Sequence, residues 1–213
     1  MKKAKPTFTM IEIEPKIFLF EFESRDDLAM TFLRMQEHYE SPHFSGKIFS
    51  LDQFKKWYKK YTGKDKFTYP DDWAGFNIPS YILKPFYGGK FKKITARERA
   101  LMDALKKQRG KFYAIGCIKG SVGVLNHEIT HARFYIHKQY QEEVMCAIKE
   151  YDAKEMYQLL SKHMYGFETW DDELNAYLVN GWNFLKKALK PASIKVFTKL
   201  SNDLKKINKR YFN

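Results

Sequence analysis

The five residues His127-Glu128-Ile129-Thr130-His131 constrain this chain more than any other feature, because they form the HExxH pattern of hydrolytic zinc sites. On a helix, residues four positions apart lie one above the other, so both imidazoles can reach one metal ion. Glu128 would flank the metal-binding face, where its carboxylate can accept a proton from a water molecule. The pattern therefore predicts a helix over 122–137 that carries a zinc site.

The residues around the motif divide this predicted helix into three faces at 100° per residue. One face is apolar and is predicted to pack in the core: Leu125, Ile129, Ala132 and Ile136. A second face is polar: Asn126, Thr130, Arg133 and His137. The third carries both motif histidines together with Val124, Phe134 and Tyr135. This arrangement suits a metal site in which apolar side chains exclude water from one side of the ion. The alternative interpretation is two ordinary histidines on a half-buried helix.

A catalytic zinc ion takes three protein ligands and leaves one position for water, so a third ligand is expected elsewhere in the chain. Glu173 is the best candidate, because it begins a stripe that continues through Tyr177 and Asn180 on a second predicted helix, 170–187. The alternative is that Glu173 is a solvent-exposed acid at a helix start. A fourth protein ligand, such as His163, would instead indicate a structural ion.

Two further acids stand beside Glu173 at the start of that helix. Thr169 and Asp172 are predicted to cap it, and both Asp171 and Asp172 suit the positive end of the helix dipole. Asp171 and Asp172 are the alternative ligands if Glu173 does not reach the metal.

The two segments His127-Glu128-Ile129-Thr130-His131-Ala132 and Glu173-Leu174-Asn175-Ala176-Tyr177 together resemble the gluzincin branch of the zinc metallopeptidases. The resemblance implies that His127, His131 and Glu173 hold one Zn²⁺ and that Glu128 is the general base. It covers the C-terminal part of the chain and is specific only at these two helices. The N-terminal part resembles a group of uncharacterised microbial proteins. The transition-state donor of the gluzincins, a His or a Tyr, has several candidate counterparts: Tyr177, His163 and Tyr165.

An apolar run at 112–118, bounded by glycines, predicts a strand upstream of the metal helix. Ala114 and Gly116 fall on one face of it and leave room beside the strand. The resemblance to zincins implies an edge strand that pairs with an extended substrate, which makes these two residues candidates for substrate binding. A central strand whose small residues accommodate a helix is an equally good interpretation.

The length of 213 residues and a hydrophobic content of 44% predict one domain with a real core. An N-terminal α+β part, 1–94, would precede a helical catalytic part, 95–213, in an α+β, zincin-like fold with a small sheet. Cys117 and Cys146 are not arranged as a ligand pair, and no apolar segment has the length of a signal or a membrane span. These features predict a soluble, cytoplasmic protein.

Hydrophobic periodicity predicts the remaining elements. Strands are expected at 10–13 and 17–22, and helices at 25–39, 51–61, 96–108, 139–151, 154–165 and 192–207. The proline-rich stretch 63–89 is predicted to be irregular but packed.

The net charge of +13 is the strongest competing signal, since a basic surface can bind nucleic acid or an anionic membrane. Residues 182–213 hold nine lysines and arginines against one acid, Asp203. These charges are also explained as the solvated side of a helix that buries Phe197, Leu200 and Leu204. The mixture of lysines and aromatic residues at 54–61 resembles a stacking platform for single-stranded nucleic acid, although its spacing fits a core face better.

The resemblance and the motif together predict a zinc-dependent peptidase, in which Glu128 activates a water molecule for attack on a peptide bond. The alternative is a basic nucleic-acid-binding protein with a structural or vestigial zinc site, or a protease recruited to nucleic acid. In the first case peptides or proteins are the partners, and nucleic-acid binding through the C-terminal helix is weak and non-specific.

Overall fold

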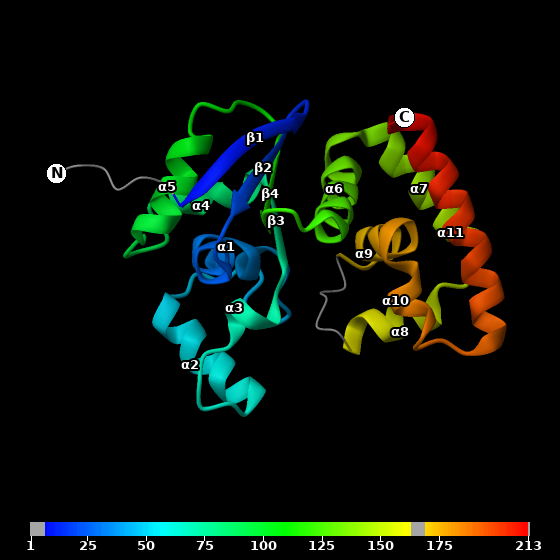
Figure 1. The fold of residues 1–213 in the computed structure, drawn as a ribbon, viewed down its shortest axis with the longest axis horizontal. Coiled ribbons are helices and arrows are strands. Elements are labelled where there is room, and N and C mark those ends of the chain that lie inside the picture. Colours follow the sequence, from blue (N-terminus) through cyan, green and yellow to red (C-terminus); the bar gives the residue numbers. More distant parts are fainter. Residues whose placement is uncertain (1–6, 163–168, 213) are drawn as a thin grey trace. The chain divides into compact units, whose positions relative to one another are not determined.

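The computed structural model describes residues 7–162 and 169–212. The chain divides into two compact units, Met1–Leu125 and Asn126–Asn213, and Figure 1 shows the elements of each. The helix Ala96–Leu105 and the strand Tyr113–Ile118 pack with elements that precede residue 94. The boundary between the two units therefore lies after Leu125, whereas the sequence predicted a subdivision after residue 94. That the chain forms a single domain stays a prediction.

The first unit is built on a four-stranded sheet in the order β1-β2-β4-β3. β1 (Phe8–Glu14) and β2 (Ile17–Phe22), the two strands predicted near the N-terminus, form an antiparallel hairpin, and β4 (Tyr113–Ile118) runs parallel to β2. β3 (Gly75–Pro79) pairs antiparallel with β4, inside the stretch that the sequence predicted to be irregular. The predicted packing of this stretch is confirmed, since Phe76, Ile78 and Phe86 are buried. The prediction that it is irregular was wrong, because a five-residue strand ending in proline is too short to show an alternating pattern.

Helices pack with this sheet in the core of the first unit. They are α1 (Arg25–Glu40), α2 (Leu51–Thr62), α3 (Tyr69–Asp72), η1 (Ser80–Leu83), α4 (Lys84–Tyr87) and α5 (Ala96–Leu105). Helix α1 contacts three strands of the sheet. Phe32 of α1 is fully buried, and its ring packs against Phe20 and Phe22 of β2 and against Phe76 of β3. The α+β class is therefore confirmed, with a small sheet and a majority of helices.

The interpretation of Ala114 and Gly116 as substrate-binding residues of an edge strand is wrong. Both lie on β4, which is paired on one side with β2 and on the other with β3, so it has no free edge for a peptide. A Cβ atom on Gly116 would lie 2.5 Å from Cε2 of Phe32. The small residue is therefore needed where α1 approaches the centre of the sheet, which was the other interpretation of the sequence.

The second unit is helical. It contains α6 (Val122–Ile136) from Asn126 onward, α7 (Lys138–Lys149), α8 (Lys154–Lys162), α9 (Trp170–Ala176), the π-helical turn η3 (Tyr177–Gly181), α10 (Trp182–Lys186) and α11 (Pro191–Phe212). Leu174 and Leu178 are fully buried and Leu185 nearly so. The predicted 170–187 helix is continuous, but a π turn interrupts its α-helical hydrogen bonding.

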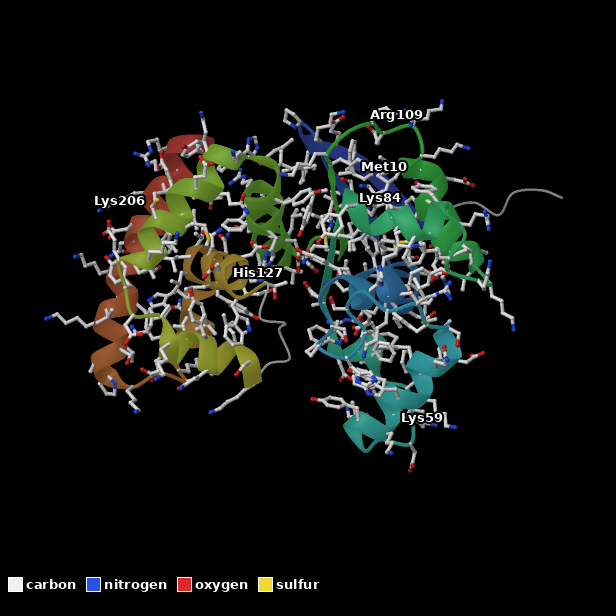
Figure 2. The ribbon with its side chains drawn as sticks, turned by 180° about the vertical axis from the view of Figure 1, so that it is seen from behind. Met10, Lys59, Lys84, Arg109, His127 and Lys206 are labelled. Carbon is white, nitrogen blue, oxygen red and sulfur yellow. The ribbon has the colours of Figure 1, made fainter. Side chains whose placement is uncertain are left out.

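The basic C-terminal segment is organised around the core of the second unit. Phe197, Leu200 and Leu204 of α11 are buried, so the predicted apolar stripe packs inward and leaves the lysines on the outside; Lys206 is labelled in Figure 2. Arg210 pairs with Glu143 of α7, and Lys206 pairs with Asp203 at 3.5 Å. Nucleic-acid binding by this helix stays a prediction. Among the described residues, no helix combines the length and the apolar character that a membrane crossing requires.

Glu37 is a buried carboxyl in the first unit, on α1. It accepts a hydrogen bond of 2.7 Å from the hydroxyl group of Tyr69. Burial raises the pKa of Glu37 to about 7, although the hydrogen bonds of Tyr69 and Ser41 act in the opposite direction. The native chain therefore holds a proton at this position at pH values where the unfolded chain has lost it.

We expect the free energy of unfolding to fall as pH rises between about 4.5 and about 7 because of this group. The stabilisation from the raised pKa is fully present below the unfolded value and is lost as pH rises through the folded value, and it amounts to roughly 3 kcal/mol. Urea titrations at several pH values measure it. Glu37→Gln should remove this part of the pH dependence, whereas Glu23→Gln, at an exposed glutamate, should retain it. An unchanged pH profile in the Glu37→Gln variant would contradict the assignment.

Candidate metal centre

Both motif histidines lie on α6 with their rings turned toward each other. The Nε2 atoms of His127 and His131 are 3.2 Å apart, and the ring centroids are 4.8 Å apart at an interplanar angle of 79°. His131 is 2% exposed, and His127 is half-buried. Two nitrogen donors therefore converge on one point, as the spacing of four residues on a helix predicts.

Glu173 of α9 brings a carboxylate to the same point. Its Oε2 atom is 3.9 Å from Nε2 of His127, and its Oε1 atom is 3.7 Å from Nε2 of His131. One ligand atom from each of the three residues lies within 4.8 Å of the others. Ligands at the usual zinc bond lengths in a tetrahedron stand about 3.4 Å apart, so these spacings are close to those of a zinc site. Glu173 is only 3% exposed, which excludes a solvent-exposed acid.

Three consecutive acids at the start of α9 have three different partners. Asp171 accepts a hydrogen bond from the hydroxyl group of Tyr157, and Asp172 lies 3.0 Å from Nδ1 of His131. Glu173 faces the Nε2 atoms of the two histidines. The helical period separates these directions by about 100° each. Asp171 and Asp172, the alternative ligands, are therefore committed to other contacts.

The predicted capping role of Asp172 is wrong. Thr169 precedes α9, but its side chain makes no capping hydrogen bond. Asp172 instead contacts the nitrogen of His131 that faces away from His127. A carboxylate in this position holds the ring and keeps its proton on Nδ1, which leaves Nε2 as the metal-binding nitrogen.

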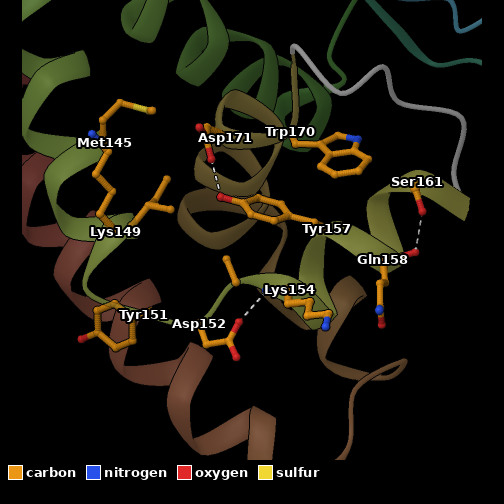
Figure 3. Close-up of a pocket in the computed structure, with 12 residues that line it drawn as sticks. Met145, Lys149, Tyr151, Asp152, Lys154, Tyr157, Gln158, Ser161, Trp170 and Asp171 are labelled. Carbon is orange, nitrogen blue, oxygen red and sulfur yellow. Dashed lines mark hydrogen bonds between the residues drawn. The ribbon is translucent and has the colours of Figure 1, made fainter.

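Asp171 belongs to a pocket on the other side of α9. The pocket has a volume of about 460 Å³ and is lined from α7, α8 and α9 (Figure 3). Tyr157 donates its hydroxyl proton to Asp171 and stacks on Trp170 at a centroid distance of 5.5 Å. Asp171 is therefore fixed by α8 and does not contribute to the metal centre.

Asn180 fixes α6 against the helix that carries the carboxylates. Its amide group donates to the carbonyl oxygen of Asn126 at 2.9 Å and to the hydroxyl oxygen of Thr130 at 2.6 Å. Thr130 is only 1% exposed, although the sequence placed it on a polar face. The sequence misassigned this face because a polar residue paired with another polar residue can be buried at little cost.

Tyr177 is the only predicted transition-state donor within the described residues, because His163 and Tyr165 lie outside them. Its ring packs against His127 with a centroid distance of 4.7 Å. A Cβ atom at Gly181 would lie 2.8 Å from Cδ1 of Tyr177. Gly181 thus makes room for this ring in its own helix.

The pKa values of the two histidines are shifted in opposite directions. Burial and the charge of His131 lower the pKa of His127 to about 3. Burial alone would also lower the pKa of His131, but the carboxylates of Asp172, Glu173 and Glu128 raise it well above its usual value. Glu128 is 7% exposed and therefore acts as a buried charge near the centre. In the metal-free site, His131 therefore carries a second ring proton, on Nε2. A metal ion must displace this proton in order to bind.

No family model, curated protein or solved structure matches this chain. The resemblance to gluzincins therefore rests on the motif residues alone and stays a prediction.

We expect Asp172→Asn to weaken zinc binding by about 10- to 100-fold, because it removes the charge that holds His131. Asp171→Asn is the matched control, since the adjacent acid contacts Tyr157. Competition with a chromophoric chelator measures both affinities. Equal losses in the two variants would show that the helix start as a whole, and not the contact with His131, is what matters.

Proposed function

We propose that this protein is a zinc-dependent peptidase in which His127, His131 and Glu173 hold the ion and Glu128 is the general base. The observation that carries the proposal is the convergence of two imidazole nitrogens and one carboxylate within 4.8 Å of one another. Two histidines and one glutamate are a ligand set of catalytic zinc, which leaves one position for water.

The donor chemistry fits zinc. Imidazole nitrogen and carboxylate oxygen are both zinc ligands, and the supporting carboxylate of Asp172 is the usual partner of a zinc-binding histidine. Zinc, when bound at such a site, lowers the pKa of water to near neutrality and polarises a substrate carbonyl.

Three residues of the chain have the other roles in the proposed reaction. Glu128 accepts a proton from the attacking water and returns it to the leaving amine. Asp172 keeps His131 in one orientation and one tautomer through their 3.0 Å contact. Tyr177, whose ring lies against His127, is the candidate donor to the charge that develops on the carbonyl oxygen.

A zincin-like fold is part of the same proposal. It is supported by the order of the HExxH helix and the glutamate helix along the chain. No observation of the second unit favours the alternative of a nucleic-acid-binding protein with a vestigial zinc site. Its basic helix α11 is anchored by an apolar stripe, and Tyr211 and Phe212 at its end pack on Tyr140.

Metal analysis of protein purified without added metal tests the proposal directly. We expect about one zinc per chain, and cleavage of fluorescein-labelled casein that stops with 1,10-phenanthroline and returns with added Zn²⁺. Zinc bound without any cleavage of casein or of a mixed peptide library would indicate a structural ion. Protein that takes up no zinc at pH 8, where His127 is neutral and a metal ion has only to displace the additional proton of His131, would refute the metal centre itself.

A further inference from the structure

A row of stacked aromatic rings lies on the surface of the first unit, beside α2. The ring of Trp57 stacks on Tyr61 with a centroid distance of 5.0 Å and an interplanar angle of 14°. The imidazole of His43 stacks on Trp57 at 5.1 Å and 12°. The three rings, which we call the ring stack, are nearly parallel to one another. The three ring planes are therefore stacked in the way that bases are stacked in single-stranded nucleic acid.

The ring stack is not part of the buried core, although it adjoins it. Phe54 and Tyr58 of α2 are buried, so the core face that the sequence predicted for this helix is confirmed at these two positions only. Tyr61, by contrast, is 54% exposed and Trp57 is half-buried. Among the described residues, no ring other than Trp57 packs on Tyr61. One face of the last ring is therefore open to a further planar group.

Lysines accompany the ring stack. Residues 51–67 hold six lysines against two acids, Asp52 and Asp65. Lys56 and Lys60 each precede a stacked ring by one position, so they form a second row about 100° around α2, on the side away from Phe54 and Tyr58. We call this pair the lysine row.

The lysines of this surface are largely available to an external anion. Lys56, Lys59, Lys60 and Lys66 are exposed, and none forms an ion pair with a described residue; Lys59 is labelled in Figure 2. Two lysines are exceptions: Lys64 pairs with Asp72 at 3.2 Å, and Lys55 is half-buried with its Nζ atom 5.3 Å from the ring centroid of Phe67. The helix thus presents positive charge beside a planar aromatic surface.

We propose that this surface of α2 binds single-stranded nucleic acid, with a base stacked on Tyr61 and phosphates held by the lysine row. Aromatic platforms beside a basic track are how proteins bind single strands without regard to sequence. A duplex offers no unstacked base to the open ring. An anionic membrane would match the lysines but would leave the parallel stacking of three rings without a role. The inference is independent of the metal centre.

Fluorescence anisotropy of the full chain with a labelled oligodeoxythymidine of about 16 nucleotides tests this proposal. We expect Tyr61→Ala to weaken binding by about tenfold or more, and Tyr61→Phe, which keeps the ring, to bind as the wild type does. Tyr87→Ala is the matched control, because Tyr87 is a similarly exposed tyrosine elsewhere on the same unit. Far-UV circular dichroism checks that each variant is folded.

The salt dependence gives a second readout. Replacing Lys56 and Lys60 by glutamine should flatten the slope of log affinity against log salt by about 0.7 per lysine, whereas Lys84→Gln, another exposed lysine of the first unit, should leave it unchanged. Absence of oligonucleotide binding at low salt would overturn the proposal. So would equal losses in Tyr61→Ala and Tyr87→Ala, or binding to phosphatidylserine vesicles without binding to the oligonucleotide.

Discussion

Glu128→Gln is expected to leave zinc bound and to lower kcat on casein or a good peptide by about 10²- to 10⁴-fold. Glutamine keeps the size and the hydrogen-bonding capacity of the side chain, but it cannot accept a proton from water. Because Glu128 is buried beside the two histidines without being one of the converging ligands, the substitution separates the chemical step from metal binding. Metal analysis and initial rates on the same protein sample measure the two effects.

Glu128→Asp is the companion variant, since it keeps the carboxylate and shortens the side chain by one methylene. It should retain zinc and recover part of the lost rate. We expect His131→Ala to lose zinc, because it removes one of the three converging donors. If Glu128→Gln lost zinc as completely as that variant, Glu128 would be a ligand or a structural group, and the proposed roles would be wrong.

Removal of Glu173 is expected to have the largest effect on the metal itself. Glu173→Ala should weaken zinc binding by more than about 100-fold, beyond the loss expected from a supporting residue such as Asp172. The carboxylate supplies one of three donors and comes from a different helix than the other two, so no neighbouring side chain of α6 replaces it. Titration with a chromophoric chelator at fixed pH gives the affinity.

Asp171→Ala controls for the removal of a negative charge from the start of α9. It should change stability by roughly 0.5–2 kcal/mol through the lost contact with Tyr157 and the helix dipole, while zinc affinity stays near the wild-type value. If zinc affinity were unchanged in Glu173→Ala, the third ligand would have to be sought elsewhere.

Much of the helical structure could be predicted from the sequence, because amphipathic stripes such as that of α11 repeat over several turns. The hairpin of β1 and β2 was also predictable from two apolar runs close together in the chain. Strand β3 was not, since its identity depends on pairing with β4, which lies far away in the sequence. The same long-range pairing decides that β4 is a central strand and not an edge.

The residues of the metal centre were predictable as a set, because both histidines share one helical face and Glu173 begins a stripe on another helix. That these three residues bind a metal ion stays a prediction. The supporting contacts were not predictable. Asp172 has the sequence signature of a helix cap, and only the approach of α6 turns it into a partner of His131. Asn180 likewise belongs to a polar stripe whose partner, Thr130, is known only from the packing.

The π-helical turn at Tyr177–Gly181 has a consequence for how this helix tolerates change in length. A π turn places one more residue in the helix than an α-helical path would require, so positions before and after it differ in phase by about 100°. The deletion of one residue between Tyr177 and Gly181 would restore a regular helix. With Leu185 kept in the core, Glu173 would still face the histidines, because the π turn had absorbed the extra residue without changing the phase of the flanking helix. If all five residues became regular α-helix instead, Glu173 would turn away by about 100°, so the π turn sets the direction in which the carboxylate points.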